Sequence, residues 1–475
     1  QVFLEFFREH VVWERPQAMT IGIQIVRDQP DVVRDSEKRR LRDGKIVDEV
    51  LEIDKEWRSA DFNVNQQRKE IGIIQKGITE KKKESKGKDE CLDELAEKNK
   101  CEAKLAELEQ VAKTLLVKRD TRLKAVGNLL HTSVPVSDDE KNNEEVVKWG
   151  VPRSFTAKYL TDGFRPHFEL LEMLGAVDFE AGREVAGNRG YFLSGPGVLL
   201  NQALINYGIA FMSSRGYTPL QPPFFMKKDL MAKTAELDDY DDVLYKVMES
   251  PDQPELDKYM IATSEQPISA YHYNESVDQK RFPLRYVGIS SCFRREAGSS
   301  GRDIRGIFRV HQFEKIEQFV LTSPETSWQE HESMIQMAGE FYQSLGIPYH
   351  VVAIVSGEIN NAAAKKYDLE GWFPGDDDGK GKYRELVSCS NCLDYQARAM
   401  GTKYGFLNTD PYCHMLNSTV CATERALCCL VENYQEAGGV RVPRVLVPYM
   451  LGQEFLPFVK TLKPEKAEKP KAAKK

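Results

Sequence analysis

The sequence lacks three features, and each absence excludes a class of protein. No apolar run reaches the roughly 18 residues that a membrane-spanning helix needs, so we expect no membrane association. The nine cysteines are scattered and odd in number, which argues against a disulfide framework and favours a reducing compartment. The third missing feature is an overall excess of positive charge. The net charge is -7, so any nucleic-acid binding must use a local basic patch rather than the whole surface.

The sequence also lacks the ligand set of a structural zinc site. Cys389 and Cys392 form a single CxxC pair, and a tetrahedral site would need two further ligands. Cys413 and His414 are the only candidates nearby in the sequence. We therefore expect no zinc and interpret these cysteines as buried thiols.

A long helical hairpin is predicted near the N-terminus of a chain whose 475 residues suffice for two or three domains. Apolar or small side chains recur at intervals of three and four, the spacing of a coiled-coil seam. They are Val50, Ile53, Trp57, Ala60, Val64, Ile71, Ile74 and Ile78, then Leu105, Leu108, Ala112, Leu115 and Val126. The apolar-free stretch KKKESKGKDE lies between the two series and is typical of a turn. Because neither helix can bury its stripe alone, we expect an antiparallel pair over about 45–127.

Basic side chains gather toward the tip of this hairpin: Arg68, Lys69, Lys76, Lys82 and Lys83. A lysine-rich helix face is most often a solvated surface. The alternative is an arm that follows the phosphates of an RNA.

Composition divides the rest of the chain. Residues 132–150 are rich in proline, serine and acidic side chains and indicate a linker. Residues 151–461 mix helices with short strands, and the lysine-rich tail at 462–475 is expected to be disordered.

The most informative segment is 290–319, which carries five arginines. Tyr286–Phe293 and Ile307–Val320 are predicted strands around an exposed loop at Ala297–Gly306. Guanidinium groups bind phosphate oxygens in pairs and keep their charge, so such a hairpin can hold a polyphosphate. An ordinary edge hairpin with a solvated loop is the alternative.

The order of residues in this segment resembles motif 2 of the class II aminoacyl-tRNA synthetases. Phe293-Arg294-x-Glu296, Arg309 with His311-Gln312-Phe313, and Glu317 follow the order of the seryl-tRNA synthetases of the eukaryotic cytosolic type. The helix at Leu199–Met212 and the strand before Pro223 resemble motif 1, and Asn417-x-Thr419 followed by Arg425 resembles motif 3. The resemblance runs in unbroken order over roughly residues 30–460.

The resemblance implies an α+β fold and a serine–tRNA ligase. The fold would be a mainly antiparallel sheet flanked by helices, preceded by an N-terminal tRNA-binding domain at 1–131 that contains the antiparallel helical hairpin. The enzyme would be a cytoplasmic homodimer, with Pro223 at the dimer interface, that charges tRNA(Ser), and tRNA(Sec) as well, through a seryl-adenylate.

Site residues are carried over from the same resemblance. Arg294 and Arg425 would be catalytic. Serine would be bound by Thr263, Glu265, Arg294, Glu317, Asn417 and Thr419. ATP would be bound by Arg294, Glu296, Arg309, Val310, Phe313, Glu385, Leu386, Val387, Ser388 and Arg425, with Mg²⁺ on Glu385 and Ser388. The tRNA would contact Arg68, Lys69, Lys76, Lys82 and Lys83.

Physical chemistry agrees with several of these roles. Fixed positive charge beside the α-phosphorus lowers the barrier to adenylate formation. A buried carboxylate at Glu317 would be left unpaired by alanine, which penalises that substrate. In Thr263-Ser-Glu265, a hydroxyl and a carboxylate two residues apart can point to one side of an extended chain, although the same letters can also form a helix cap.

Rival interpretations remain from the sequence. A paralogue that has lost charging could act as an RNA-binding or regulatory module, but the arginines and glutamates of all three motifs argue against it. A ligase for another small amino acid is disfavoured by Glu317 with Thr419, which suit a hydroxyl side chain. A coiled-coil scaffold explains only the first quarter of the chain.

Overall fold

The computed structural model describes residues 20–86, 88–153, 163–234, 243–296 and 305–462. It divides into two compact units, one of Ala18–His131 with Asn360–Ala362 and one of the remaining chain. Most of the loop expected at Ala297–Gly306, and all but the first residue of the expected disordered tail, lie outside the described residues.

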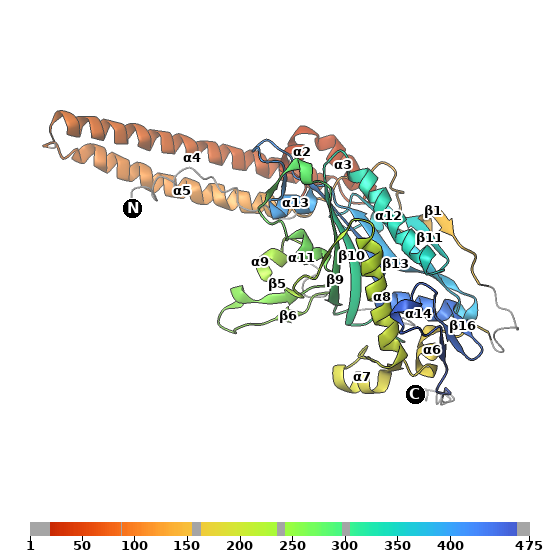
Figure 1. Cartoon of the computed structure of the whole chain (residues 1–475). Coiled ribbons are helices and arrows are strands. Elements are labelled where there is room, and N and C mark those ends of the chain that lie inside the picture. The colour runs from red at the N-terminus through yellow and green to blue at the C-terminus, as the bar shows by residue number, and fades with distance from the viewer. Residues whose placement is uncertain (1–19, 87, 154–162, 235–242, 297–304, 463–475) are drawn as a thin grey trace, which may run out of the picture. The chain divides into compact units, whose positions relative to one another are not determined.

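The smaller unit contains the predicted hairpin. Its helices are α2 (Ile23–Asp28), α3 (Pro30–Arg39), α4 (Lys45–Glu84) and α5 (Leu92–Leu123). The long helices α4 and α5 run side by side along their length (Figure 1). Ala60, Val64 and Ala112 are buried between them, with Leu105, Leu108 and Leu115 packed against this cluster. The apolar seam predicted from the sequence is therefore the one that holds the pair together.

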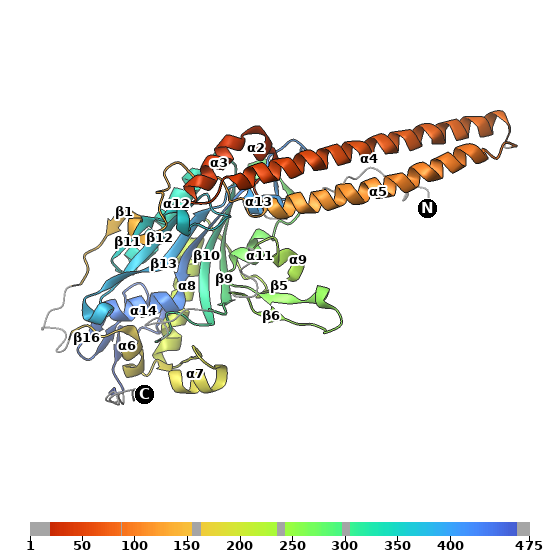
Figure 2. The ribbon, with the colours of Figure 1, turned by 180° about the vertical axis from the view of Figure 1, so that it is seen from behind.

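The larger unit is organised by an eight-stranded sheet. Several of its strands, from β1 to β9, are labelled in the two opposite views (Figures 1 and 2). Only the edge pair β4 and β9 is parallel, and all other neighbours are antiparallel. In sheet order the strands are β1 (Glu144–Trp149), β11 (Tyr349–Ala353), β12 (Lys365–Phe373), β13 (Lys382–Asn391), β15 (His414–Ala422), β10 (Gln312–Thr322), β9 (Leu284–Phe293) and β4 (Thr218–Leu220).

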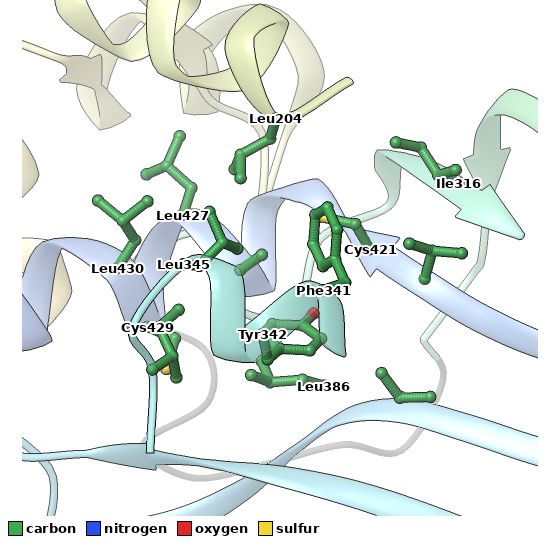
Figure 3. Close-up of a cluster of buried hydrophobic side chains, with 14 of the residues drawn as sticks. Leu204, Ile316, Phe341, Tyr342, Leu345, Leu386, Cys421, Leu427, Cys429 and Leu430 are labelled. Carbon is green, nitrogen blue, oxygen red and sulfur yellow. The ribbon is translucent and has the colours of Figure 1, made fainter. Parts of the chain in front are cut away.

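Three helices cover one face of this sheet, the back face. They are α8 (Pro196–Ser213), α12 (Ser327–Ser344) and α14 (Thr423–Asn433). Figure 3 shows Leu204, Phe341 and Leu427 from these helices among side chains from the strands. This cluster forms the main hydrophobic core of the unit.

The opposite, front face carries two short helices, α11 (Glu265–Ser269) and α13 (Tyr395–Met400). Ile268 of α11 and Met400 of α13 are buried in a second cluster with Phe319 of β10. Because alternate residues of a strand point to opposite faces, β10 presents Lys315 and Glu317 to the same face as Phe319.

The remaining elements are small. The helices are α6 (His167–Met173), α7 (Phe179–Ala186) and α9 (Lys228–Met231). The short strands are β2 (Val177–Asp178), β3 (Phe192–Leu193), β5 (Phe225–Lys227), β6 (Lys246–Val247), β7 (Lys258–Met260), β8 (Ser276–Val277), β14 (Lys403–Tyr404), β16 (Gln435–Glu436), β17 (Gly439–Arg441) and β18 (Phe455–Pro457). None of the helices in the described ranges combines the length and apolar character needed to cross a bilayer.

A β-bulge in β13 decides which of its side chains reach the front face. Leu369 pairs with Val387 and Glu370 with Glu385, so Leu386 is an extra residue. Leu386 and Val387 are both buried in the back-face core. The bulge therefore allows Glu385 and Ser388, three residues apart, to point to the front together.

A second bulge lies in β15. Ile316 pairs with Cys421 and Glu317 with Thr419, which leaves Val420 as the extra residue. Val420 and Cys421 are both buried in the back-face core. Thr419 consequently lies beside Glu317 on the front face.

Two local predictions were wrong. The strand expected to resume at Ile307 begins at Gln312 instead, because the side chains of Ile307, Phe308 and Val310 turn into the core. Thr263 and Glu265 do not lie on an extended chain: Glu265 opens α11, and its backbone N–H donates to Thr263 Oγ1 at 3.2 Å. The helix-start alternative describes this segment better.

Candidate active site

The front face holds a compact group of polar side chains that we call the acid cluster. Its members are Glu265, Lys315, Glu317, Gln396, Asn417 and Thr419, drawn from α11, β10, α13 and β15. Four of them are predicted serine-binding residues, and the sheet brings them together. Lys315 and Gln396 were not predicted from the sequence.

Glu317 lies at the floor of the acid cluster with only 2% of its surface exposed. Its Oε2 lies 2.7 Å from Lys315 Nζ and accepts a hydrogen bond from Thr419 Oγ1 at 3.1 Å. Within the described part of the chain, no hydrogen bond reaches Oε1. The carboxylate therefore has one committed oxygen and one that can accept a hydrogen bond from a ligand.

Glu265 is the second acid of the cluster. Its Oε1 accepts hydrogen bonds from Gln396 Nε2 at 2.7 Å and Asn417 Nδ2 at 3.0 Å. Burial and the nearby charge of Glu317 raise the pKa of Glu265 to about 7. This carboxyl group therefore changes its charge near neutral pH.

Arg294 borders the cluster at the end of the β9 strand. Its Nε donates to the Ala262 carbonyl at 3.4 Å, and its guanidinium lies 5.3 Å from the ring centre of Phe313. Its charge is one of those that lower the pKa of Glu265. Arg294 thus joins the acid cluster to the region where the sequence predicts ATP.

Two of the predicted phosphate-binding arginines, Arg309 and Arg425, each contact a carboxylate. Arg425 Nη1 lies 3.2 Å from Glu385 Oε2, and its guanidinium packs 4.9 Å from the ring centre of Phe308. Burial disfavours the charge of Glu385, but Arg425, Lys366 and Arg294 outweigh that effect and hold the pKa of this carboxyl at about 2. Glu385 therefore stays ionised over the whole physiological range.

A second arginine group surrounds Glu296. Arg309 Nη1 and Arg189 Nη1 each lie 3.7 Å from Glu296 Oε2, and Arg189 also donates to the Glu296 carbonyl at 3.2 Å. Arg189 was not predicted from the sequence, because a single arginine between glycines matches none of the motifs described above. Glu296 itself has a positive φ of 49°, an uncommon conformation for a residue with a side chain.

Three of the predicted ATP-binding residues do not present their side chains to this face. Val310, Leu386 and Val387 are buried in the back-face core. The turn at Val310 and the bulge in β13 direct these side chains away from the front face. Only their backbone groups can contribute to a ligand site.

The pair Glu385 and Ser388 fits a hard cation such as Mg²⁺, which prefers oxygen ligands. Asp368 lies opposite Ser388 in the strand pairing. Its Oδ2 is 3.2 Å from Lys366 Nζ, and its Oδ1 is buried without a hydrogen-bond partner among the described residues. The donor set therefore suits a cation that keeps some of its water.

The cysteines have separate surroundings. The Cys389 thiol contacts the His331 carbonyl at 3.9 Å, whereas Cys392 Sγ accepts from Asn417 Nδ2 at 3.6 Å. Within the described ranges, no group of three or more histidine, cysteine or acidic side chains has a geometry suited to a metal ion.

The other predicted residues lie away from this face. Pro223 follows β4 and is exposed. Arg68 pairs with Glu109 across the helical hairpin at 2.7 Å. Lys69, Lys76, Lys82 and Lys83 are exposed on α4.

The comparison with protein families first defines a class. Residues 245–434 match the family described as tRNA synthetase class II core domain (G, H, P, S and T). This segment contains the acid cluster, Arg294 and Arg425. The fold and the site are those of a class II, ATP-using synthetase.

Further matches define the family within that class. Residues 21–130 match the seryl-tRNA synthetase N-terminal domain. The chain is 49% identical to the cytoplasmic serine–tRNA ligase of Arabidopsis thaliana, over 91% of this chain and 94% of that protein. It belongs to the seryl-tRNA synthetase family.

Solved structures agree. A cytoplasmic serine–tRNA ligase from Naegleria fowleri in complex with AMP is 45% identical and superposes with a TM-score of 0.82, covering 94% of this chain and 100% of that one. A seryl-tRNA synthetase from Pyrococcus horikoshii complexed with ATP is 38% identical with the same TM-score of 0.82, covering 93% of this chain and 100% of that one. These comparisons confirm the predicted fold, ligase function and cytoplasmic type.

Proposed function

We propose that the front face of the sheet activates serine with ATP, and that the product is transferred to the 3′ end of tRNA(Ser). Serine attacks the α-phosphorus of ATP, which gives seryl-adenylate and releases pyrophosphate. The terminal ribose hydroxyl of the tRNA then attacks the acyl carbon and releases AMP. No side chain has to act as a nucleophile, so positioning and electrostatics supply the rate.

Each end of serine has a proposed partner in the acid cluster. Thr263 and Glu265 hold the amino group, Arg294 the carboxylate, and Glu317 the hydroxyl, with Asn417 and Thr419 as the walls. The observation that carries this assignment is the carboxylate of Glu317, whose Oε2 is taken by Lys315 and Thr419 while Oε1 is available. A Glu317 Oε1 that is left without a hydrogen bond penalises alanine, which has no hydroxyl to offer.

ATP is proposed to bind along the arginines. Arg294 contacts the α-phosphate, Arg309 and Arg425 the outer phosphates, and Phe313 stacks on adenine beside Glu296. Glu385 and Ser388 would hold Mg²⁺, which supplies positive charge beside the phosphates. When the phosphates bind, they can take over the arginines that now contact Glu296 and Glu385.

The decisive experiment is ATP–pyrophosphate exchange without tRNA, with serine, alanine, threonine and glycine. Exchange with serine alone, lost in Glu317→Gln, supports the proposed pocket. Absence of exchange from a folded protein that still binds RNA would instead support the catalytically inactive paralogue.

The helical hairpin is the proposed tRNA-binding element of an N-terminal domain at 1–131, joined by the linker at 132–150 to the catalytic domain at 151–461. Lys69, Lys76 and Lys83 are spaced by seven residues, so they share one face of α4. Such a row suits RNA backbone rather than bases. Arg68 is a weaker candidate than predicted, because Glu109 already pairs with it.

The test is Lys82→Glu with Lys83→Glu. We expect a higher KM for tRNA and unchanged pyrophosphate exchange. Equal losses in both assays would contradict an RNA role for these lysines.

We also propose a homodimer with Pro223 at the interface, on the resemblance of α8 and β4 to motif 1. Sedimentation of the parent chain and of Pro223→Ala would test it. A monomeric parent at micromolar concentration would contradict it.

A further inference from the structure

The two residues that β10 contributes to the acid cluster form a buried ion pair. Lys315 and Glu317 are 7% and 2% exposed, and Lys315 Nζ lies 2.7 Å from Glu317 Oε2. A strand places residues two apart on one face, so the pair is a direct product of the β10 backbone. A lysine and a glutamate this deeply buried are each costly unless they remain paired.

The geometry of the pair fixes which oxygen a ligand can reach. Oε2 of Glu317 is contacted by Lys315 of the same strand and by Thr419 of the neighbouring, bulged strand β15. Any rotation of the carboxylate that turns Oε2 toward a ligand breaks both contacts. One oxygen, Oε1, is therefore presented in one direction.

A second acid lies close to this ion pair. Besides burial, the charge of Glu317 contributes to the raised pKa of Glu265, so the two carboxyl groups interact. Lys315 contacts Glu317 on Oε2 and therefore places positive charge on one oxygen of this acid.

We propose that Lys315 is a specificity-determining residue, which holds the Glu317 carboxylate in one orientation so that the pocket accepts a hydroxyl amino acid and rejects alanine. Lys315 acts through Glu317 and is a positioning residue rather than a catalytic one. This inference rests on the proposed assignment of Glu317 to the serine hydroxyl.

Replacing Lys315 with methionine keeps the length of the side chain and removes its charge. Glu317 would then lose one of the two contacts that fix Oε2, so its carboxylate could turn and Oε1 would no longer be held in one direction. We expect the KM for serine to rise about 10- to 100-fold, the KM for ATP to stay within about twofold, and the serine-to-alanine ratio of kcat/KM to fall at least about tenfold.

The chain offers a closely matched control. Lys365 of β12 is 8% exposed and pairs with Glu332 at 3.6 Å, but it lies on the back face near the ring of Tyr367. Lys365→Met therefore also removes a buried, carboxylate-paired lysine from the sheet. We expect it to leave the serine-to-alanine ratio unchanged.

The experiment measures pyrophosphate exchange with serine and with alanine for the parent, Lys315→Met, Lys315→Arg and Lys365→Met. Lys315→Arg keeps a positive charge beside Oε2 and should restore most of the discrimination. A loss shared by serine and alanine alike, or a failure of Lys315→Arg to restore discrimination, would overturn the proposal.

A second variant guards against loss of folding. Lys315→Met with Glu317→Gln leaves no unpaired buried charge, so it should fold. The proposal expects its kcat/KM for serine to equal that of Glu317→Gln alone, because Lys315 acts only through Glu317. A further tenfold loss in the double variant would contradict that. If Glu317→Gln alone retains discrimination, the assignment of Glu317 fails; if it loses discrimination while Lys315→Met does not, only the present inference fails.

Discussion

The two halves of the front face, which we propose to bind serine and the phosphates of ATP and call the serine side and the phosphate side, use charge in opposite ways. On the serine side, acids are the recognising groups, and Lys315, Gln396 and Asn417 hold them in place. On the phosphate side, arginines are the recognising groups, and Glu296 and Glu385 contact them. The first arrangement offers a ligand an oxygen that is free, whereas the second offers cations that a polyanion must take from carboxylates. The difference shows that selection of the amino acid and neutralisation of the phosphate charge can be assigned to separate residues on one sheet.

Arg294 contacts both sides, so its replacement should have the largest effect. Arg294→Ala removes the only proposed contact shared by the serine carboxylate and the α-phosphate. We expect pyrophosphate exchange to fall about 1,000-fold or more, by analogy with loss of a transition-state donor. Arg441→Ala, which removes an exposed arginine paired with Glu436, is the control. A loss of exchange activity below tenfold would contradict this comparison of the two sides, because Arg294 would then not be a residue that both sides need.

Glu385 tests the phosphate side alone. Glu385→Gln should raise the Mg²⁺ concentration needed for half-maximal exchange and lower kcat about 100-fold, with little change in the KM for serine. Titration with Mg²⁺ at saturating ATP measures it, and Mn²⁺ binding followed by electron paramagnetic resonance gives a readout independent of activity. An equal rise in the KM for serine would show that the two sides are not separable.

The pH dependence should differ between the sides. The pKa of Glu265 is raised to about 7, so this carboxyl is mostly protonated at pH 6 and mostly ionised at pH 8. If its carboxylate holds the ammonium group, the KM for serine should fall up to about tenfold between these values. Glu385, with a pKa of about 2, stays ionised, so the KM for ATP should not follow this trend. Glu265→Gln should abolish the pH dependence for serine.

A smaller effect, on stability rather than activity, is expected at His350 of β11. Its Nδ1 lies 2.8 Å from Glu145 Oε2, and its Nε2 lies 2.7 Å from Glu370 Oε2. Burial opposes the imidazolium, but the two carboxylates outweigh it and raise the pKa of His350. A raised histidine pKa adds stability below the ordinary value of about 6.5, and this contribution is lost as the pH rises through the folded-state pKa.

His350→Gln should therefore lower the free energy of unfolding by about 1 kcal/mol at pH 6 and by less at pH 9, measured by urea denaturation. His414, whose pKa is lowered by burial, is the counterpart. Its replacement with glutamine should show the opposite trend with pH. Identical profiles for the two variants would argue against the two carboxylates as the cause.

Sequence patterns predicted the elements better than the directions of their side chains. The helical hairpin, the helix at Leu199–Met212 and the strand at Tyr286–Phe293 were found because apolar spacing and turn residues are local signals. The directions of Leu386 and Val387 could not be predicted, because a bulge breaks the two-residue alternation and a single sequence carries no signal for an extra residue in one strand. The contact of Arg425 with Glu385 joins distant segments and could not be read from either. Lys315 could have been found, since it lies two residues from Glu317 in a predicted strand.

The two bulges have a consequence for how amino-acid preference can change. The side chains of Leu386 and Val420 point into the back-face core, yet the presence of these residues sets the phase of β13 and β15 against their neighbours. Deleting Val420 would turn Thr419 toward the core while every residue proposed to bind serine stayed in the sequence. If the proposed serine pocket is correct, its shape therefore depends partly on the number of residues within a strand, which a list of site residues does not record.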